Sequence, residues 1–283
     1  MRCPALFACC LAFFFTLSGQ QKPLVVFVCG DHEYSGEQTL PLLAEALEAR
    51  YGIRTLVLRS APDQNGEKDI PGLEALKSAD LAVFFLRWRQ LPTDQLAQIE
   101  AYLTSAKPLI GLRTTTHGFN FPPGHPSRRW NDFGEFALNA PPGWGGKAGH
   151  THYGHESSTD VTIVSQAADH PILKGVDAAF HVRSWLYRVQ PDYPLAGSQW
   201  LLQGKAVNPD KVATVNPVAW TGTNAYGGRL FMTTLGHPED FAVESFQRLM
   251  VNAVLWQLAI RPKKWRGKLP IAVPYRGIVA SRP

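Results

Sequence analysis

The chain has 283 residues, 45% of them hydrophobic and 18% charged, a composition that supports a buried core and excludes an intrinsically disordered protein. The length suits one large α/β domain or two small ones. The formal net charge of +5 arises from 28 basic and 23 acidic residues. Without Arg2 and the seven basic residues beyond position 260, 20 basic residues face 23 acidic ones, so the body of the chain is slightly acidic.

The N-terminus has the pattern of a secretory signal peptide, which we assign to residues 1–20. Arg2 precedes an apolar run from position 5 to position 17, and small and polar residues end the run. Because this run is too short to span a bilayer comfortably, we expect cleavage and a periplasmic or secreted protein, and favour an uncleaved anchor less. No later stretch is long and apolar enough to cross a membrane. Of four cysteines only Cys29 lies beyond this segment, so the mature protein has no internal disulfide.

The next part of the chain alternates strand and helix patterns. Apolar runs predict buried strands at residues 22–30, 54–59, 80–86 and 107–112. Helical spacing of apolar residues predicts helices at residues 37–51 and 93–105, the second with Thr93 as its N-cap. Strands that alternate with helices are typical of a doubly wound, mostly parallel α/β sheet with helices on both faces.

The pattern changes between residues 117 and 159, which are rich in Gly, Pro, His and Trp and show little periodicity. A stretch this long inside a compact domain is usually functional, and we expect it to fold over the carboxyl edge of the sheet. Strand patterns return at residues 160–164, 180–189, 200–203, 217–220 and 229–235, and residues 241–260 predict a final helix.

The domain is expected to span residues 21–260 and to be followed by a basic tail, residues 261–283. The tail has seven basic residues and no acidic ones. Such a tail could contact anionic lipid or nucleic acid. We favour a solvated extension that is draped over the domain and that folding does not require, because an exported protein rarely meets nucleic acid.

Polar residues follow three of the predicted strands, where open parallel sheets bind their ligands. Because imidazole titrates near neutral pH, the candidates for acid/base catalysis are His32, His117 and His237, with helix capping or a structural hydrogen bond as the alternative. Arg113 could hold an oxyanion or a sugar hydroxyl, and the large aromatic side chains could stack on a sugar. The substrate-binding candidates are Asp31, Glu33, Arg113, Thr115, Trp144 and Tyr153.

A metal is a further possibility. His150, His152 and His155 lie close together in the long loop, and several imidazoles can share one divalent ion such as zinc. Hydrogen bonding within a Gly-rich loop is an equally good interpretation of these three residues. Neither a phosphate loop nor a dinucleotide fingerprint is present, so we predict no nucleotide cofactor.

Several short motifs resemble those of the ThuA-like (trehalose utilisation) family. They lie at residues 30–33, 110–119, 169–172, 217–220 and 228–256. The resemblance implies a flavodoxin-like fold of the class I glutamine-amidotransferase-like superfamily and a link to oxidised or unusual sugars. Amidotransferase relatives carry a nucleophilic cysteine at the turn after a central strand. This chain has Arg113 and Thr114 at the comparable turn, so we expect no cysteine-dependent amidotransferase activity.

Two functions remain open at this point. The first is an enzyme that acts on a keto-sugar or its glycoside, as an isomerase, lyase or hydrolase, through histidine acid/base chemistry with possible help from a metal. The second is a sugar-binding or scaffold protein without catalysis. In both cases we expect a small carbohydrate as the partner and no nucleic acid. We also expect His32, Arg113, His117, His150, His152 and His237 to converge on one pocket.

Overall fold

The computed structural model describes residues 22–145, 149–262, 265 and 267–277. The predicted signal peptide lies outside the described residues. Helices of the structure are α1 (Gly36–Tyr51), α2 (Thr93–Thr104), α3 (Phe133–Leu138) and α4 (Glu244–Gln257). The strands are β1 (Leu24–Gly30), β2 (Arg54–Arg59), β3 (Leu81–Leu86), β4 (Leu109–Leu112), β5 (Thr151–His152), β6 (Ser158–Ile163), β7 (Ala179–Val182), β8 (Tyr187–Arg188), β9 (Gln199–Val207), β10 (Asn216–Thr223) and β11 (Arg229–Thr233).

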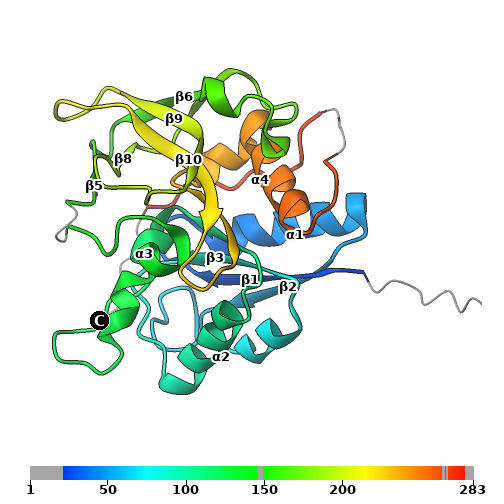
Figure 1. Ribbon diagram of the computed structural model, residues 1–283, viewed down its shortest axis with the longest axis vertical. Helices are drawn as coiled ribbons and strands as arrows, with labels where there is room; N and C mark the ends of the chain where they lie inside the picture. Colours follow the sequence, from blue (N-terminus) through cyan, green and yellow to red (C-terminus); the bar gives the residue numbers. More distant parts are fainter. Residues whose placement is uncertain (1–21, 146–148, 263–264, 266, 278–283) are drawn as a thin grey trace, which may run out of the picture.

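A nine-stranded sheet forms the centre of the molecule, in the order β2-β1-β3-β4-β11-β10-β9-β6-β7 (Figure 1). The first five strands in this order pair in parallel, as the alternation of strands and helices predicts. β3 and β4 are completely buried, because helices cover both faces of this part of the sheet. The predicted α/β, flavodoxin-like fold is confirmed.

The remaining strands extend the sheet with antiparallel pairs. β10 runs antiparallel to β11, and β9, β6 and β7 continue outward in the same way. On this side of the sheet β6 and β7 alternate between buried and exposed residues, as strands with one solvated face do. Outside this sheet, β5 and β8 form a separate two-stranded ribbon.

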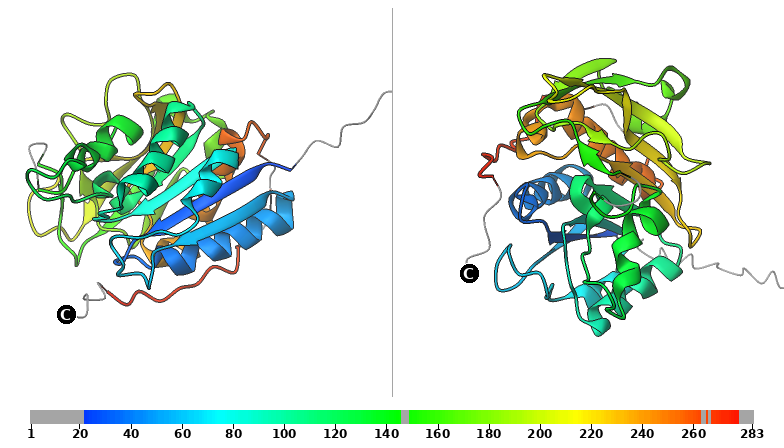
Figure 2. Two further views of the ribbon diagram at one scale, coloured as in Figure 1. Left: turned by 90° about the horizontal axis from the view of Figure 1, so that it is seen from below. Right: turned by 90° about the vertical axis from the view of Figure 1, so that its left-hand side faces the viewer.

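Helices lie on both faces of the sheet, α1 and α4 on one and α2 and α3 on the other (Figures 1 and 2). The short helix α3 lies within the stretch in which we expected little periodicity. Its Leu138 packs so closely on β4 that a Cβ at Gly111 would lie 2.6 Å from Leu138 Cδ2, which explains the glycine there. The predicted N-cap of α2 is wrong by one residue: Pro92 is the cap and Thr93 is the first helical residue.

The C-terminal segment is packed against the domain, so the expectation of a solvated extension is wrong. Leu269, Ile271 and Val273 are buried, and the residues between them are exposed. The segment runs beside α1 in the left view of Figure 2. Its alternation of inward apolar and outward residues is typical of an extended strand on a protein surface, and this pattern is present in the sequence.

None of the helices formed by the described residues is long and apolar enough to cross a membrane.

Candidate functional site

The turn after β1 is fixed by a buried carboxylate. Asp31 accepts hydrogen bonds from the backbone N–H of Tyr34 at 2.7 Å and of Glu33 at 3.2 Å. Burial and then the neighbouring Glu33 raise the pKa of Asp31 to about 7, against the opposing effect of these hydrogen bonds. Asp31 therefore shapes the turn that presents its neighbours and does not line the cavity described below.

His32 is held at both ring nitrogens by guanidinium groups. Nε2 lies 2.5 Å from Arg87 Nη1, and Nδ1 lies 2.5 Å from Arg89 Nη2. Burial, Arg89 and Arg87 lower the pKa of His32 to about 3, so the ring is neutral at physiological pH. Arg87 also pairs with Glu33, at 2.7 Å between Nε and Oε2. A neutral imidazole can accept from only one of these two guanidinium groups, at its lone-pair nitrogen, and its other nitrogen carries the proton and faces the second guanidinium, so His32 has no free lone pair for a substrate proton.

Arg113 occupies the turn after β4 in a left-handed conformation, with φ of 41°. A side chain larger than glycine is rare there, and the strain is of the kind found at functional turns. Its buried guanidinium donates to Thr234 O at 2.9 Å and to Tyr34 Oη at 3.0 Å. Arg113 Cζ also lies over the rings of Tyr34, Trp185 and Tyr187, at 4.2, 4.8 and 4.6 Å from their centroids.

Two cavities that share three lining residues lie at this edge of the sheet. The inner cavity has a volume of 170 Å³, and it is lined by Glu33, Tyr34, Arg87, Trp88, His117, Trp144, His152, His155, Trp185 and Tyr187. The outer cavity has a volume of 860 Å³, and its lining includes Asn120, Arg128, Asn131, Asp132, Glu135 and Asp192. Trp88, His117 and Trp144 line both cavities, which together we call the cleft.

His117 lies at the junction of the two cavities. It follows β4 by one short turn and is only 3% exposed. Burial and then the nearby His150 lower the pKa of His117 well below its usual range, so the ring is neutral. Its Nδ1 lies 2.9 Å from the hydroxyl of Thr116, and the ring centroid lies 4.6 Å from that of Trp144. His117 is therefore the predicted catalytic residue that lines the cleft.

The three loop histidines do not surround one point. His150 Nδ1 donates to Gly143 O at 2.8 Å, and burial lowers its pKa to about 4. His152 and His155 pair with each other, their ring centroids 4.2 Å apart. The ring of Trp144 packs against both His150 and His152, with centroids at 4.7 and 5.7 Å. Among the described residues, no three His, Cys, Asp or Glu side chains are grouped so that they could hold one metal ion, and a bound metal stays a prediction.

His237 packs against residues of the inner cavity. Its Nδ1 accepts a hydrogen bond from the Glu239 backbone N–H at 3.2 Å, so Nε2 carries the proton of the neutral ring. That Nε2 is buried and has no partner among the described residues. Burial, Arg113 and Arg183 lower the pKa of His237 to about 3.

The C-terminal segment contributes one residue, Tyr275, to the surroundings of His237. Tyr275 packs on His237, with ring centroids 4.4 Å apart, and stacks on Tyr34 at 6.2 Å. Trp185 also contacts His237, at 5.8 Å. His237 is therefore enclosed by aromatic rings from three parts of the chain.

Besides Asp31, two further predicted substrate-binding residues do not line the cleft. The Thr115 hydroxyl lies 2.6 Å from Leu112 O and accepts a hydrogen bond from Leu86 N at 3.1 Å, so it joins β3 to the turn after β4. Tyr153 lines a separate cavity on the far side of the β5–β8 ribbon. Glu33 and Trp144 line the cleft, and Arg113 lies behind its aromatic wall.

Residues that the sequence analysis missed complete the cleft. Tyr34, Trp88 and Tyr187 line its inner cavity, and Tyr275, which is outside the lining, packs on His237. Tyr34 directly follows the predicted Asp31–Glu33 group, so its position was a usable signal. Trp88 lies two residues beyond β3, and Tyr187 lies in β8, whose pairing with β5 cannot be read from local periodicity.

The cleft belongs to a chain with recognisable relatives. The model of the family described as "ThuA: Trehalose utilisation" matches residues 63–257. A ThuA-like protein of Parabacteroides merdae has a similar structure, with a TM-score of 0.63, 15% identity, and coverage of 87% of this chain and 93% of the other. A ThuA-like protein of Bacteroides uniformis has a TM-score of 0.56 at 15% identity, covering 90% and 95%. None of the curated protein sequences matches the chain.

At these identities the two structures show a shared fold alone, whereas the family match covers most of the chain. It includes the turns that carry Arg113, His117 and His237 and begins after the turn that carries His32. The predicted family is confirmed: the chain belongs to the ThuA family, described by its role in trehalose utilisation.

Proposed function

We propose that this ThuA-family protein binds a carbohydrate, a keto-sugar or its glycoside, in the cleft and acts on it by acid/base chemistry centred on His117. The observation that carries the proposal is the position of Trp88, His117 and Trp144 at the junction of the two cavities. A sugar ring offers C–H faces to aromatic rings and hydroxyls to polar side chains, and the inner cavity has both kinds of wall.

The charges of the inner cavity suit a ketone. Arg87 lines it as a guanidinium that is paired with the carboxylate of Glu33, and His117 lines it with a neutral ring. A ketone acidifies the neighbouring C–H bond, so the imidazole takes that proton while electron density moves to the carbonyl oxygen. Arg87 then stabilises the enolate oxygen. When the enolate oxygen gains a proton and the hydroxyl of the neighbouring carbon loses one, return of the carbon-bound proton to the former carbonyl carbon gives an isomer; departure of a group from the next carbon with its electron pair, followed by its protonation, gives an elimination product.

The alternative is a sugar-binding protein without catalysis. His32, one of the predicted bases, contacts guanidinium groups through both nitrogens, and burial lowers the pKa values of the site histidines. A strongly lowered pKa makes an imidazole a weak base, which favours binding over proton transfer.

A His117→Ala variant separates the two functions. If the cleft is catalytic, turnover of keto-sugars and their glycosides should fall by about 100-fold or more, the usual contribution of a general base, and sugar binding should change far less. His181→Ala is the matched control, because His181 is exposed on β7 and pairs with Asp160 away from the cleft. Sugar binding without turnover in the unmodified protein would establish the alternative. Neither binding nor turnover for any member of a keto-sugar panel would refute the proposal.

We also propose that the protein is exported to the periplasm or secreted, on the basis of the apolar segment near its N-terminus.

A further inference from the structure

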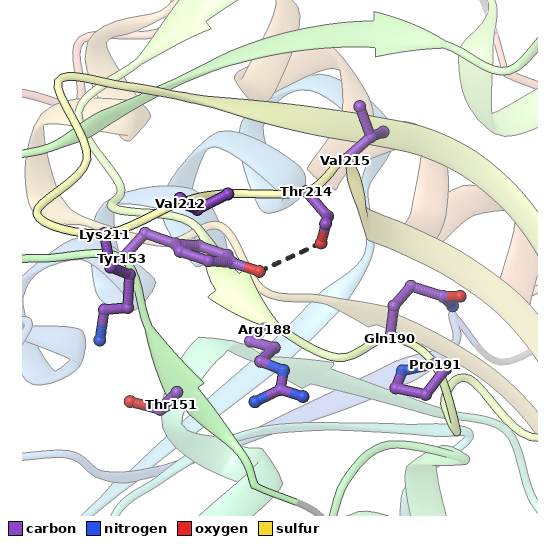
Figure 3. A pocket seen from close by; sticks show the side chains of 9 residues that line it. All are labelled: Thr151, Tyr153, Arg188, Gln190, Pro191, Lys211, Val212, Thr214 and Val215. Carbon is purple, nitrogen blue, oxygen red and sulfur yellow. Dashed lines mark hydrogen bonds between the residues drawn. The ribbon is translucent and has the colours of Figure 1, made fainter.

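The β5–β8 ribbon has two faces, and each face lines a different cavity. Its register pairs Thr151 with Arg188 and His152 with Tyr187. Because successive residues of a strand point to opposite sides, each of these pairs lies on one face. His152 and Tyr187 line the inner cavity, and Thr151 and Arg188 line a separate cavity of 510 Å³, which we call the side cavity (Figure 3). The ribbon is thus a wall one residue thick between two cavities.

A buried asparagine fixes the walls of the side cavity. Asn216 is fully buried, and its Oδ1 accepts from the backbone N–H of Val189 at 2.7 Å and of Gln190 at 2.9 Å. Its Nδ2 donates to Thr214 O at 3.0 Å and to Tyr153 Oη at 3.3 Å. The Tyr153 hydroxyl also contacts Thr214 Oγ1 at 3.2 Å, the interaction drawn in Figure 3. One side chain therefore joins all three segments that surround the cavity.

The side cavity is cationic. Arg188 and Lys211 are the charged residues among the nine that line it, and none of the nine is acidic. Both side chains run in the same direction in Figure 3. The Lys211 ammonium lies 3.7 Å from Asp210 Oδ1, outside the lining, and an exposed pair at this distance contributes little. The Arg188 guanidinium has no acidic partner among the described residues, and its planar N–H groups match a carboxylate.

The rest of the lining suits the body of a sugar. The ring of Tyr153 and the side chains of Pro191, Val212 and Val215 offer an apolar surface, of which Val212 is 94% exposed. Hydroxyl and amide groups from the threonines and the glutamine of the lining can bind sugar hydroxyls. A volume of 510 Å³ lies in the range of about 300–1,000 Å³ typical of small-molecule sites.

We propose that the side cavity is a second binding site, which takes a carboxylate-bearing sugar with its carboxylate on Arg188 and Lys211. The inference is independent of the chemistry proposed for the cleft, because no residue lines both the side cavity and either cavity of the cleft.

Titration calorimetry with D-glucuronate tests the proposal, with D-glucose and inorganic phosphate as the probes that lack the carboxylate or the sugar. The full chain should bind glucuronate saturably and bind glucose and phosphate at least about tenfold more weakly. Arg188→Gln and Lys211→Gln should each weaken glucuronate binding by about tenfold or more, since each removes a charge-assisted hydrogen bond. Arg54→Gln, an exposed arginine of β2 at the other edge of the sheet, is the matched control and should bind as the unmodified protein does.

Three results would overturn the proposal. They are the absence of saturable glucuronate binding, equal binding of phosphate, and glucuronate binding that both charge-removing variants leave intact. If His117→Ala removes glucuronate binding and Arg188→Gln does not, the sugar acid binds in the cleft, which rejects the second site and leaves the proposed function standing. Equal melting temperatures of the variants show that a loss of binding is not a loss of fold.

Discussion

Replacing Ile271 by alanine tests whether the C-terminal segment belongs to the folded domain. Ile271 is 2% exposed and Leu269 is 3% exposed. At Leu269 the segment is hydrogen-bonded to α4, because the buried Gln247 accepts from Leu269 N at 2.7 Å and donates to Leu269 O at 3.0 Å. The segment begins near Trp265, whose ring Arg50 covers at the end of α1, and it reaches Tyr275 at the start of α1.

The expected cost follows from the burial of this side chain. Truncating a buried isoleucine to alanine destabilises a protein by about 2–5 kcal/mol, the larger values applying where the cavity cannot collapse. Because Ile271 belongs to a surface segment that can settle inward, we expect a loss of about 2–3 kcal/mol in the free energy of unfolding. For a domain of this size the melting temperature should fall by roughly 4–12 °C, at about 2–4 °C per kcal/mol.

Urea unfolding of the purified protein, followed by tryptophan fluorescence, measures this loss as a lower midpoint at an unchanged slope. Ala272→Ser is the matched control, because Ala272 is the exposed neighbour and should change stability by less than about 0.5 kcal/mol. A solvated tail would give two variants of equal stability, and that result would refute the packing of this segment.

Two further predictions concern pH and export. Burial lowers the pKa values of His32, His150 and His237 to about 3, 4 and 3, below the value near 6.5 of an unfolded chain. The contribution of these neutral rings to the free energy of unfolding is therefore complete above about pH 6.5 and is lost as the pH falls. Three carboxyl groups whose pKa burial raises, Asp31, Glu37 and Asp240, act in the opposite direction, but six histidines with lowered pKa values outnumber them, so the urea midpoint should fall between about pH 7 and 4.5; a constant midpoint would contradict this. N-terminal sequencing of protein recovered from outside the cytoplasm should begin near residues 19–22, and intact Met1 would contradict cleavage.

The parallel half of the sheet could be predicted because its signals are local. β2 matches its predicted bounds, and β3 begins one residue later than predicted. Continuous apolar runs there identify buried strands without knowledge of their neighbours. The antiparallel half could be predicted as strands but not as an arrangement, because the order β11-β10-β9-β6-β7 depends on pairing between distant residues.

The sequence could indicate the edge of the sheet at which the cleft lies, but it indicated less well which residues line the cleft. The rule that ligands bind beyond the carboxyl ends of parallel strands correctly brought His117 and Glu33 to one cavity. It does not say which way each side chain points, so Thr115 and Asp31 were included although both bond to backbone groups. Tyr153, a predicted substrate-binding residue, lines the side cavity and not the cleft, because one step along the chain from His152 changes the face of the ribbon.

The pairing of β4 with β11 has a consequence for the synthesis of the chain. Leu112 and Thr233 are partners at the end of these two strands, and roughly 120 residues separate them. At about 5–20 residues per second, a ribosome needs roughly 6–24 s to make that interval. During this time β1 to β4 can already pair, while the outer edge of β4, Leu109–Leu112, has no strand beside it. An unpaired apolar edge is a template for pairing with another chain, so we expect this edge to need protection from such pairing until β11 emerges.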